Sequence, residues 1–327
     1  MSTEPSSPFH PAAGLGDSHL QTLAGALLRP RGAGALRRER WELPDGDFLD
    51  IDRLPASPEQ PHVLVLHGLE GSSRSGYVLA TLKETRRRGW GAVGFNFRSC
   101  SGEPNRLFRS YSSGETADPL WVLHRIRELG VTGPLIAVGF SLGGNVLLKL
   151  MAEAGDDCPL TAAAAISPPY NLASCADALD QAHGLTLVYR GAFLRSLKKK
   201  TLAKASTHPE AVDFQRVREA RTIRAFDDAV TAPAYGFRDA AEYYARCSSG
   251  PMLGRIRRPT WLLSAADDPM VPIDSLPDRI DSNPLLKVTV THRGGHVGFI
   301  GGSLLHPRFW AEAQAVAFLE ARLNQAP

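Results

Sequence analysis

The sequence predicts an α/β protein with a mostly parallel central sheet of about eight strands, helices on both faces and a helical cap insertion. Short apolar runs typical of buried strands alternate along the chain with helical patterns. Strands joined in this way pair in parallel through right-handed crossovers, which place helices on both faces of the sheet. One segment, residues 167–258, contains helical pieces but no strong strand. We expect it to lie over the carboxyl edge of the sheet, where ligands bind in open α/β sheets.

Each element follows from a local pattern. The sheet is expected to begin antiparallel, because residues 38–43 and 48–54 flank the turn sequence Pro-Asp-Gly-Asp. The further strands are the runs 62–67, 91–97, 134–138, 161–166, 259–264 and 287–291. The expected helices are 75–88, 115–129, 142–154 and a last one that starts at 306–307 and continues to 323. The alanines of 161–166 alone favour a helix, so that strand depends on its place in the alternation.

The composition is that of an ordinary globular protein of 327 residues. Hydrophobic residues make up 43% and charged residues 22%, which excludes a disordered chain, a coiled coil and a small disulfide-stapled domain. The 37 basic and 34 acidic residues leave a net charge of +3, which is too small to indicate nucleic-acid binding. The sequence has no run of about 18 apolar residues, so we expect no transmembrane helix.

The N-terminus and the cysteines indicate a cytoplasmic protein. The first residues are rich in Ser and Pro and lack the positive start and apolar run of a secretory signal. We expect residues 1–16 to be mobile. The four cysteines lie far apart without a C-x-x-C spacing, which favours reduced thiols over two disulfides and disfavours a zinc site.

A serine nucleophile is predicted at Ser141. The sequence GFSLGG at 139–144 follows a strand and opens a helix, which is the context of the G-x-S-x-G nucleophile elbow. Small residues two before and two after the serine let strand and helix pass closely, and the helix N-terminus favours developing negative charge. The alternative, a glycine-rich turn with an idle serine, is disfavoured by the strand–turn–helix context.

A serine hydroxyl needs a neighbouring base to become a nucleophile. In chains with this elbow the serine comes first along the sequence, an Asp or Glu follows it, and a His comes last. The segment after the strand 259–264 offers Asp267 and Asp268, and the segment after 287–291 offers His296. We predict that His296 takes the serine proton and that one of the two aspartates orients its imidazole. His292 lies four residues earlier, but a zinc pair at that spacing needs a helix, and two glycines intervene here.

Two backbone N–H groups are predicted to form an oxyanion hole. Acyl transfer builds negative charge on a carbonyl oxygen, and preorganised donors stabilise it. One donor is expected at Leu142, directly after the nucleophile, and the other at Leu69, in the sequence HGLEG at 67–71 that follows a strand. Glycines on both sides of Leu69 let the backbone approach a substrate. An ordinary turn at the end of a strand is the alternative for this segment.

Four sequences now agree with one another: HGLEGSS, GFSLGGN, AADDPMVP and GGHVGF. Together they resemble the α/β-hydrolase superfamily, and residues 17–320 are similar to its YheT-like branch. The narrower resemblance is carried by HLQTL at 19–23, FRSCSGEPNR at 97–106, TIRAFDD at 222–228 and GFRDAAEYY at 236–244. The D-x-x-V-P sequence usual in the acid loop of this superfamily begins at Asp268, so the resemblance favours Asp268 over Asp267 as the acid.

Two positions depart from the pattern of that branch. Ser99 stands where it usually has glycine, and Ser112 stands where it usually has histidine. Neither belongs to the predicted triad of Ser141, Asp268 and His296. We expect both to reshape the mouth of the pocket.

The resemblance implies a serine hydrolase of carboxylic esters that works through an acyl-enzyme and needs no cofactor or metal. Its relatives range from short-chain carboxylesterases to acylglycerol lipases, so the implied substrate is a small-molecule or lipid ester. A serine at the elbow argues against the haloalkane dehalogenases and epoxide hydrolases of this fold, which have Asp there. The alternatives are a thioesterase or acyltransferase with the same triad, and a catalytically silent scaffold that binds a ligand or partner.

The predicted site also bears on domain organisation. Its residues span most of the chain, so we expect residues 1–327 to form one domain with residues 167–258 as its cap. The basic segment 193–204 of this cap could contact a membrane, although a solvated helix face is the simpler interpretation. The segment around His19 is expected to pack beside the acid–base loops without a catalytic role. Five cap aromatics could line an acyl pocket or pack the cap onto the sheet: Phe226, Tyr235, Phe237, Tyr243 and Tyr244.

Overall fold

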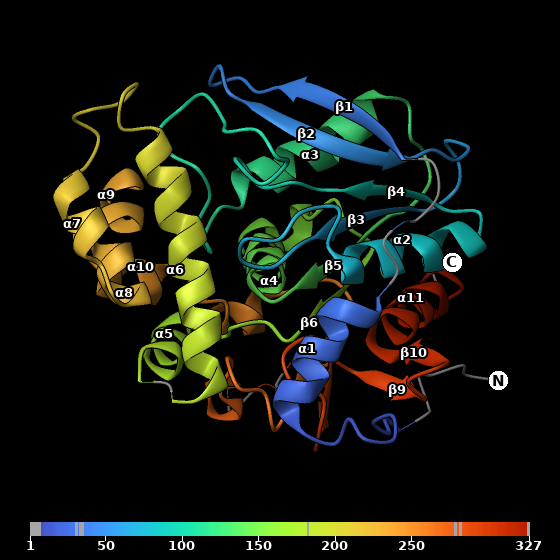
Figure 1. Cartoon of the computed structure of the whole chain (residues 1–327). Helices are drawn as coiled ribbons and strands as arrows, with labels where there is room; N and C mark the ends of the chain where they lie inside the picture. The colour runs from blue at the N-terminus through green and yellow to red at the C-terminus, as the bar shows by residue number, and fades with distance from the viewer. Residues whose placement is uncertain are drawn as a thin grey trace.

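The computed structural model describes residues 8–29, 32, 36–181, 183–277, 280 and 283–325. Within these residues eight strands form the central sheet in the order β1-β2-β4-β3-β5-β6-β7-β8 (Figure 1). Their bounds are β1 Arg37–Glu42, β2 Phe48–Leu54, β3 His62–Leu66, β4 Gly91–Gly94, β5 Leu135–Phe140, β6 Ala162–Ile166, β7 Thr260–Ala265 and β8 Leu286–Thr291. The α/β prediction with a sheet of about eight strands is therefore confirmed.

The strand directions follow the predicted pattern. β1 pairs antiparallel with β2, and β2 pairs antiparallel with β4, so the sheet begins with the expected hairpin. From β4 through β3, β5, β6 and β7 to β8 all pairs are parallel. All residues of β6 are buried, so its alanines form a strand because both faces of the sheet are covered.

Helices cover both faces of the sheet. α2 (Gly76–Arg87) and α11 (Trp310–Leu323) lie on one face, in a hydrophobic core that includes Val63 and Val65 of β3. α3 (Ala117–Glu128) and α4 (Leu142–Ala154) lie on the other, in a core that includes Leu64 and Leu66. Alternate residues of β3 thus enter two different cores, which explains why its whole run is apolar. Short 3-10 turns occur at Gly155–Asp157 and Ile273–Ser275.

Two predicted boundaries are wrong. The strand predicted at 91–97 ends at Gly94, because the chain leaves the sheet there and the Phe97 N–H donates to the imidazole Nε2 of His67 at 3.2 Å. The last helix starts at Trp310 rather than at His306-Pro307. Residues Pro307–Phe309 form β10, which pairs antiparallel with β9 (Ile300–Gly302) in a small second sheet.

The segment between β6 and β7 is helical, as predicted. It contains α5 (Leu172–Asp180), α6 (Leu185–Ala203), α7 (Phe214–Glu219), α8 (Ile223–Phe226), a π-helical turn (Asp227–Thr231), α9 (Ala232–Ala234), α10 (Ala240–Cys247) and a 3-10 helix (Gly250–Arg255). Residues from α5 to α10 share a hydrophobic cluster separate from the two cores of the sheet. Figure 1 shows these helices, in colours from yellow-green to orange, at one side of the sheet. We interpret the chain as one domain that carries this segment as a cap.

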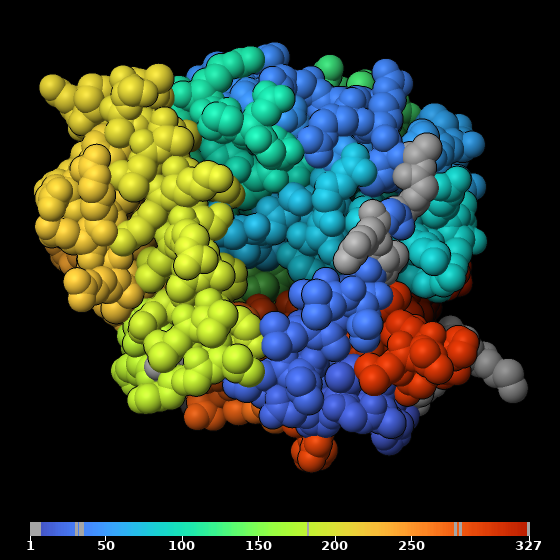
Figure 2. Space-filling view, in the orientation of Figure 1, coloured from blue at the N-terminus to red at the C-terminus, as the bar shows by residue number. Residues whose placement is uncertain are grey.

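An unpredicted helix, α1 (Ser18–Leu28), lies near the start of the chain, where Asp17 caps it by accepting the N–H groups of His19 and Leu20. Figure 2 shows α1, in blue, beside yellow-green α5 and α6, with a hollow between them. The expected mobile N-terminus of residues 1–16 needs correction. Residues 1–7 lie outside the described residues, whereas Ala12 and Leu15 are buried and the Ala12 N–H donates to the Ile300 carbonyl at 2.9 Å.

The interpretation of segment 193–204 as a solvated face is wrong for two of its lysines. Lys200 pairs with Glu70 at 3.0 Å, and the buried Lys204 ammonium donates to the carbonyl oxygens of Leu107 at 2.7 Å and Phe108 at 3.1 Å. Lys200 in α6 and Lys204 at its C-cap lie four residues apart on one side of the helix, while Lys199 is exposed. Membrane contact through this segment stays a prediction. In the described part of the chain, none of the helices is long and apolar enough to cross a membrane.

Candidate active site

Ser141 lies at the junction of β5 and α4 in a strained backbone conformation. Its φ of 50° and ψ of −123° fall where L-residues are rare, at a cost of about 1–3 kcal/mol. Backbone hydrogen bonds hold the turn on both sides: the Ser141 N–H donates to the Ile166 carbonyl at 2.9 Å, and its carbonyl accepts the Gly144 N–H at 2.8 Å. The side chain therefore stands at the N-terminus of α4, as the elbow sequence predicts.

Glycines make this turn sterically possible. A Cβ at Gly139 would lie 2.5 Å from the Gly143 carbonyl oxygen, and a Cβ at Gly143 would lie 2.4 Å from the His67 carbonyl oxygen. Both clashes are with backbone atoms, which cannot rotate away. The two glycines of the G-x-S-x-G sequence are thus required by the close passage of α4 over β5 and β3.

Gly143→Ala is expected to destabilise the fold by about 1–3 kcal/mol, because the new methyl overpacks a backbone contact. Urea unfolding followed by circular dichroism measures this change. Gly191→Ala is the matched control, since a Cβ at Gly191 in α6 meets nothing within 4 Å and alanine favours a helix. Equal unfolding midpoints for Gly143→Ala and the unchanged protein would contradict the steric argument.

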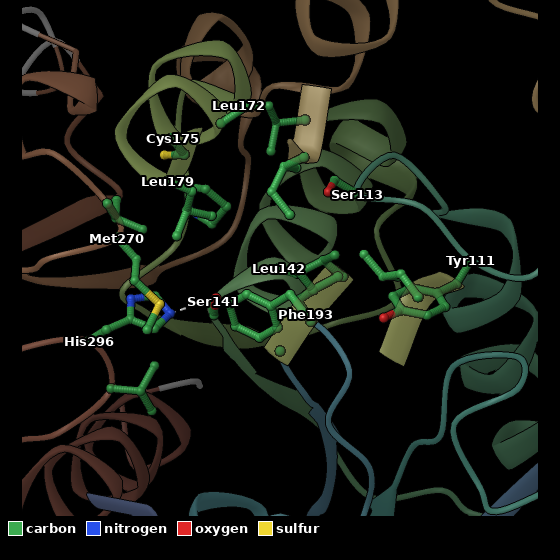
Figure 3. Close-up of a pocket in the computed structure, with 18 of the residues that line it drawn as sticks. Tyr111, Ser113, Ser141, Leu142, Leu172, Cys175, Leu179, Phe193, Met270 and His296 are labelled. Atoms are coloured by element: carbon green, nitrogen blue, oxygen red, sulfur yellow. Dashed lines mark hydrogen bonds between the residues drawn. The ribbon is translucent and has the colours of Figure 1, made fainter. Parts of the chain in front are cut away.

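His296 lies in the loop after β8 and faces Ser141. Its Nε2 is 2.8 Å from the Ser141 Oγ (Figure 3). Its Nδ1 is 2.8 Å and 3.1 Å from the two carboxylate oxygens of Asp268. Because Nδ1 faces a carboxylate, it carries the proton, and Nε2 is left to accept the serine proton. The arrangement suits the removal of a proton from a hydroxyl nucleophile.

The structure brings Asp268, and not Asp267, to the imidazole. Asp268 is 2% exposed in its side chain, and its Oδ1 also accepts the N–H groups of Met270 at 2.9 Å and Val271 at 3.0 Å. Asp267 instead accepts the Gly295 N–H at 2.9 Å and so holds the loop that carries His296. Burial raises the pKa of Asp267 above its ordinary value.

α1 supports the same loop, as expected for a segment packed beside it. The Thr22 hydroxyl oxygen accepts the His296 N–H at 2.9 Å. The buried Gln21 amide accepts the Ile300 N–H at 2.7 Å and donates to the Ile300 carbonyl at 3.0 Å.

Arg29, the C-cap of α1, holds the residue after His296. Its buried guanidinium donates to the Val297 carbonyl at 2.7 Å and pairs with Glu312. Sequence reasoning missed these three supporting residues, although Gln21 and Thr22 lie in the HLQTL sequence.

The N–H groups of Leu69 and Leu142 are available to a ligand. The neighbouring N–H groups of Gly68 and Glu70 donate to the hydroxyls of Tyr77 and Tyr111. Among the described residues, the N–H groups of Leu69 and Leu142 make no such hydrogen bond. Leu69, Ser141 and Leu142 line one cavity. Two unpaired donors beside the serine fit the expected oxyanion hole.

His67 fixes the peptide that carries the Leu69 N–H. Burial lowers the pKa of His67 to about 4, so the imidazole is neutral. Its Nε2 accepts the Phe97 N–H, and its Nδ1 donates to the Gly68 carbonyl at 2.7 Å. The Gly68 carbonyl and the Leu69 N–H belong to one planar peptide and point in opposite directions. Holding the carbonyl against His67 therefore aims the N–H away from it.

The cavity beside Ser141 has a volume of about 500 Å³ and lies between the sheet and the cap. Figure 3 shows Leu172, Cys175 and Leu179 of α5 and Phe193 of α6 around it, with Met270 near His296. Of the five cap aromatics, Phe226, Tyr243 and Tyr244 line the cavity, whereas Tyr235 and Phe237 do not. The walls are mainly apolar, which suits a hydrocarbon group.

The two departures from the family pattern have different settings. Ser99 has a φ of 65°, a conformation that glycine adopts without strain, and it lies away from the cavity lining. Ser112 lines the cavity, so only this departure stands where it can change the pocket. His292 is exposed. The described residues contain no group of three or more His, Cys, Asp or Glu placed to hold a metal ion, and all four cysteines are buried and free.

Comparison with known proteins places these features in a wider group. A family model described as alpha/beta hydrolase fold matches residues 61–303. The chain is 40% identical to "Putative esterase YheT" of Escherichia coli K12 over 98% of this chain and 95% of that protein. It is 32% identical to a monoacylglycerol lipase of Saccharomyces cerevisiae over 80% of this chain and 59% of that protein.

Two further likenesses agree with these. The chain is 29% identical to the phospholipase ABHD3 of Mus musculus over 90% of this chain and 74% of that protein. The solved structure of a Pyrococcus furiosus esterase superposes with a TM-score of 0.52 at 14% sequence identity, over 80% of this chain and 83% of that one. At this identity the likeness concerns the fold alone.

Proposed function

The chain belongs to the α/β-hydrolase family, and from this premise we propose that it is an ester hydrolase that cleaves carboxylic esters through an acyl-enzyme on Ser141. His296 is the general base and acid, Asp268 orients its imidazole, and the Leu69 and Leu142 N–H groups bind the oxyanion. The observation that carries the proposal is the hydrogen-bonded series from Ser141 through His296 to Asp268, with 2.8 Å contacts on both sides of the imidazole. The names of the esterase and lipase relatives support the same chemistry.

The reaction proceeds in two acyl transfers. Ser141 Oγ attacks the ester carbonyl as its proton passes to His296 Nε2, and the two N–H donors stabilise the oxyanion. The protonated imidazole then gives its proton to the leaving alcohol, and the acyl group stays on the serine. Water attacks this acyl-enzyme with His296 again as the base, the carboxylic acid leaves, and the serine regains its proton.

The acyl group is proposed to occupy the cavity under the cap. Its apolar walls and its volume of about 500 Å³ support an acyl chain of several carbons rather than an acetyl group alone. Relatives named monoacylglycerol lipase and phospholipase act on esters of fatty acids, so a lipid ester is the substrate class we favour.

A series of p-nitrophenyl esters from acetate to palmitate tests this proposal. We expect kcat/KM to rise with chain length by up to about fourfold per methylene, the equivalent of about 0.8 kcal/mol, until the cavity is filled. Beyond that length kcat/KM should fall. Absence of hydrolysis across the whole series would contradict an ester hydrolase, and a maximum at acetate would contradict the assignment of the cavity to the acyl chain.

A further inference from the structure

Glu70 lies directly after Leu69 in a conformation that side chains rarely adopt. Its φ is 56°, and its carboxylate is 7% exposed. A glutamate with positive φ and a buried charge is costly unless its surroundings hold it in place. The residues that contact Glu70 therefore indicate its role.

Tyr111 ties the backbone of Glu70 to its side chain. The Tyr111 hydroxyl accepts the Glu70 N–H at 2.9 Å and donates to the Glu70 Oε1 at 2.8 Å. The Tyr111 ring stacks on Phe97 at 5.3 Å between centroids, and Phe97 contacts the His67 ring edge-on at 4.9 Å. Burial raises the pKa of Tyr111, so its hydroxyl remains a donor. This side of Glu70 is fixed by the core beneath the sheet edge.

The other partners of Glu70 come from the cap helix α6. The Ser196 hydroxyl donates to Oε2, and the Lys200 ammonium donates to Oε1 at 3.0 Å. The two residues lie one helical turn apart on α6. The same helix presents Phe193 and Leu197 to the cavity beside Ser141. One cap helix thus covers the acyl cavity and neutralises the carboxylate next to Leu69.

Both peptides that flank Leu69 are pinned by these contacts. His67 and the Gly71 N–H hold the Gly68 carbonyl, at 2.7 Å and 3.0 Å, on the peptide that precedes Leu69. Tyr111 holds the Glu70 N–H on the peptide that follows. The first contact set is internal to the core. In the second, the Tyr111 hydroxyl that accepts the Glu70 N–H also donates to the Glu70 carboxylate, whose ion-pair partner is in the cap. If Lys200 moves away, the buried Glu70 carboxylate loses its counter-charge, and a conformation that exposes it to water is then favoured.

We propose, on the basis of the function proposed above, that Glu70 and Lys200 are positioning residues for the oxyanion hole. They hold the peptide that follows Leu69, while His67 holds the peptide that precedes it, and the Leu69 N–H is fully ordered toward the oxyanion only while α6 of the cap lies on the core. Neither residue touches the reacting atoms. Glu70 acts through the backbone of Leu69, and Lys200 acts through Glu70. Removal of a proton and formation of the acyl-enzyme stay with Ser141 and His296.

The test compares Glu70→Gln, Lys200→Met and the double variant with Lys199→Met. Lys199 is the matched control, because it is the exposed neighbour of Lys200 on the same helix. With a p-nitrophenyl ester that the unchanged protein hydrolyses, we expect each single variant to lower kcat about tenfold, as misplacement of an oxyanion donor does, with KM within about twofold. The double variant should equal Glu70→Gln, since both substitutions break one pair. Lys200→Arg should restore most of the rate, and Lys199→Met should leave it unchanged.

Two readouts separate positioning from a loss of structure. An alkyl trifluoromethyl ketone forms a tetrahedral oxyanion adduct with a serine, so its affinity should fall by the same factor as kcat. Hydrogen exchange of the peptide that contains residues 67–71 should speed up in Lys200→Met and not in Lys199→Met, with unchanged melting temperatures. A rise in KM alone, additive losses in the double variant, or a kcat equal to that of the unchanged protein would overturn the proposal.

If the protein is not an ester hydrolase, these measurements give a different result. In that case the unchanged protein hydrolyses none of the esters, while the hydrogen-exchange comparison still reports whether Lys200 orders residues 67–71. Unchanged exchange in Lys200→Met would then overturn the positioning proposal on its own.

Discussion

Ser141→Ala is expected to abolish ester hydrolysis, with kcat lowered by roughly 10⁵- to 10⁶-fold, as happens when a serine nucleophile is removed. The substitution removes the Oγ that hydrogen-bonds His296 at 2.8 Å and that is proposed to attack the ester. It leaves the backbone hydrogen bonds of the turn intact, so the protein should fold. Steady-state hydrolysis of a p-nitrophenyl ester measures the loss, and labelling by a fluorophosphonate probe, read by gel fluorescence and peptide mass spectrometry, identifies the reacting side chain.

Ser112→Ala is the control for this experiment, because Ser112 lines the same cavity and its hydroxyl oxygen accepts the Gly114 N–H at 3.3 Å. It should be labelled like the unchanged protein. Labelling that persists in Ser141→Ala would assign the nucleophile to another residue. An unchanged protein that resists the probe altogether would favour a silent scaffold with this fold.

Asp268→Asn should lower kcat by about 10³- to 10⁴-fold, whereas Asp267→Asn should change it by less than about tenfold. The asparagine keeps the shape of the side chain but can present an N–H to His296 Nδ1. The imidazole proton then moves to Nε2, which can no longer accept the proton of Ser141. Asp267 contacts the Gly295 N–H rather than the imidazole, so its substitution affects only the support of the loop.

Stability measurements complete this comparison. Because burial raises the pKa of Asp267 in the folded protein above its unfolded value, ionisation of this group favours the unfolded state once the pH exceeds the unfolded pKa. Asp267→Asn should therefore not lower the melting temperature at pH 7 through loss of this charge. A larger loss of kcat at Asp267 than at Asp268 would exchange the roles proposed for the two residues.

Features with a local cause could be predicted from the sequence. The elbow at 139–144 is dictated by backbone clashes that only glycine avoids, and the hairpin at 38–54 by its turn residues. Chain order and spacing led to His296 and to the two aspartates, of which the structure brings Asp268 to the imidazole. These residues lie at strand ends, where topology alone brings them to one edge of the sheet.

Features that depend on distant contacts could not be predicted in this way. The roles of Gln21 and Thr22 depend on contacts with a loop near the other end of the chain, and no local sequence pattern predicts such contacts. The sequence predicts the start of a helix at His306-Pro307, but residues Pro307–Phe309 pair with β9 and form a strand instead. The inward direction of Lys200 and Lys204 could have been inferred, since Ser196, Lys200 and Lys204 recur every four residues along α6 and its C-cap. The high lysine content concealed it.

The contact between Thr22 and His296 joins residues that are 274 positions apart, and Ser141 precedes His296 by 155 positions. During synthesis at about 5–20 residues per second, the elbow therefore leaves the ribosome roughly 10–30 s before the base. Over that interval the nascent chain carries its serine without a partner that can activate it. Translation that stops before β8 yields a polypeptide that has the elbow sequence but lacks His296, the base proposed to activate Ser141.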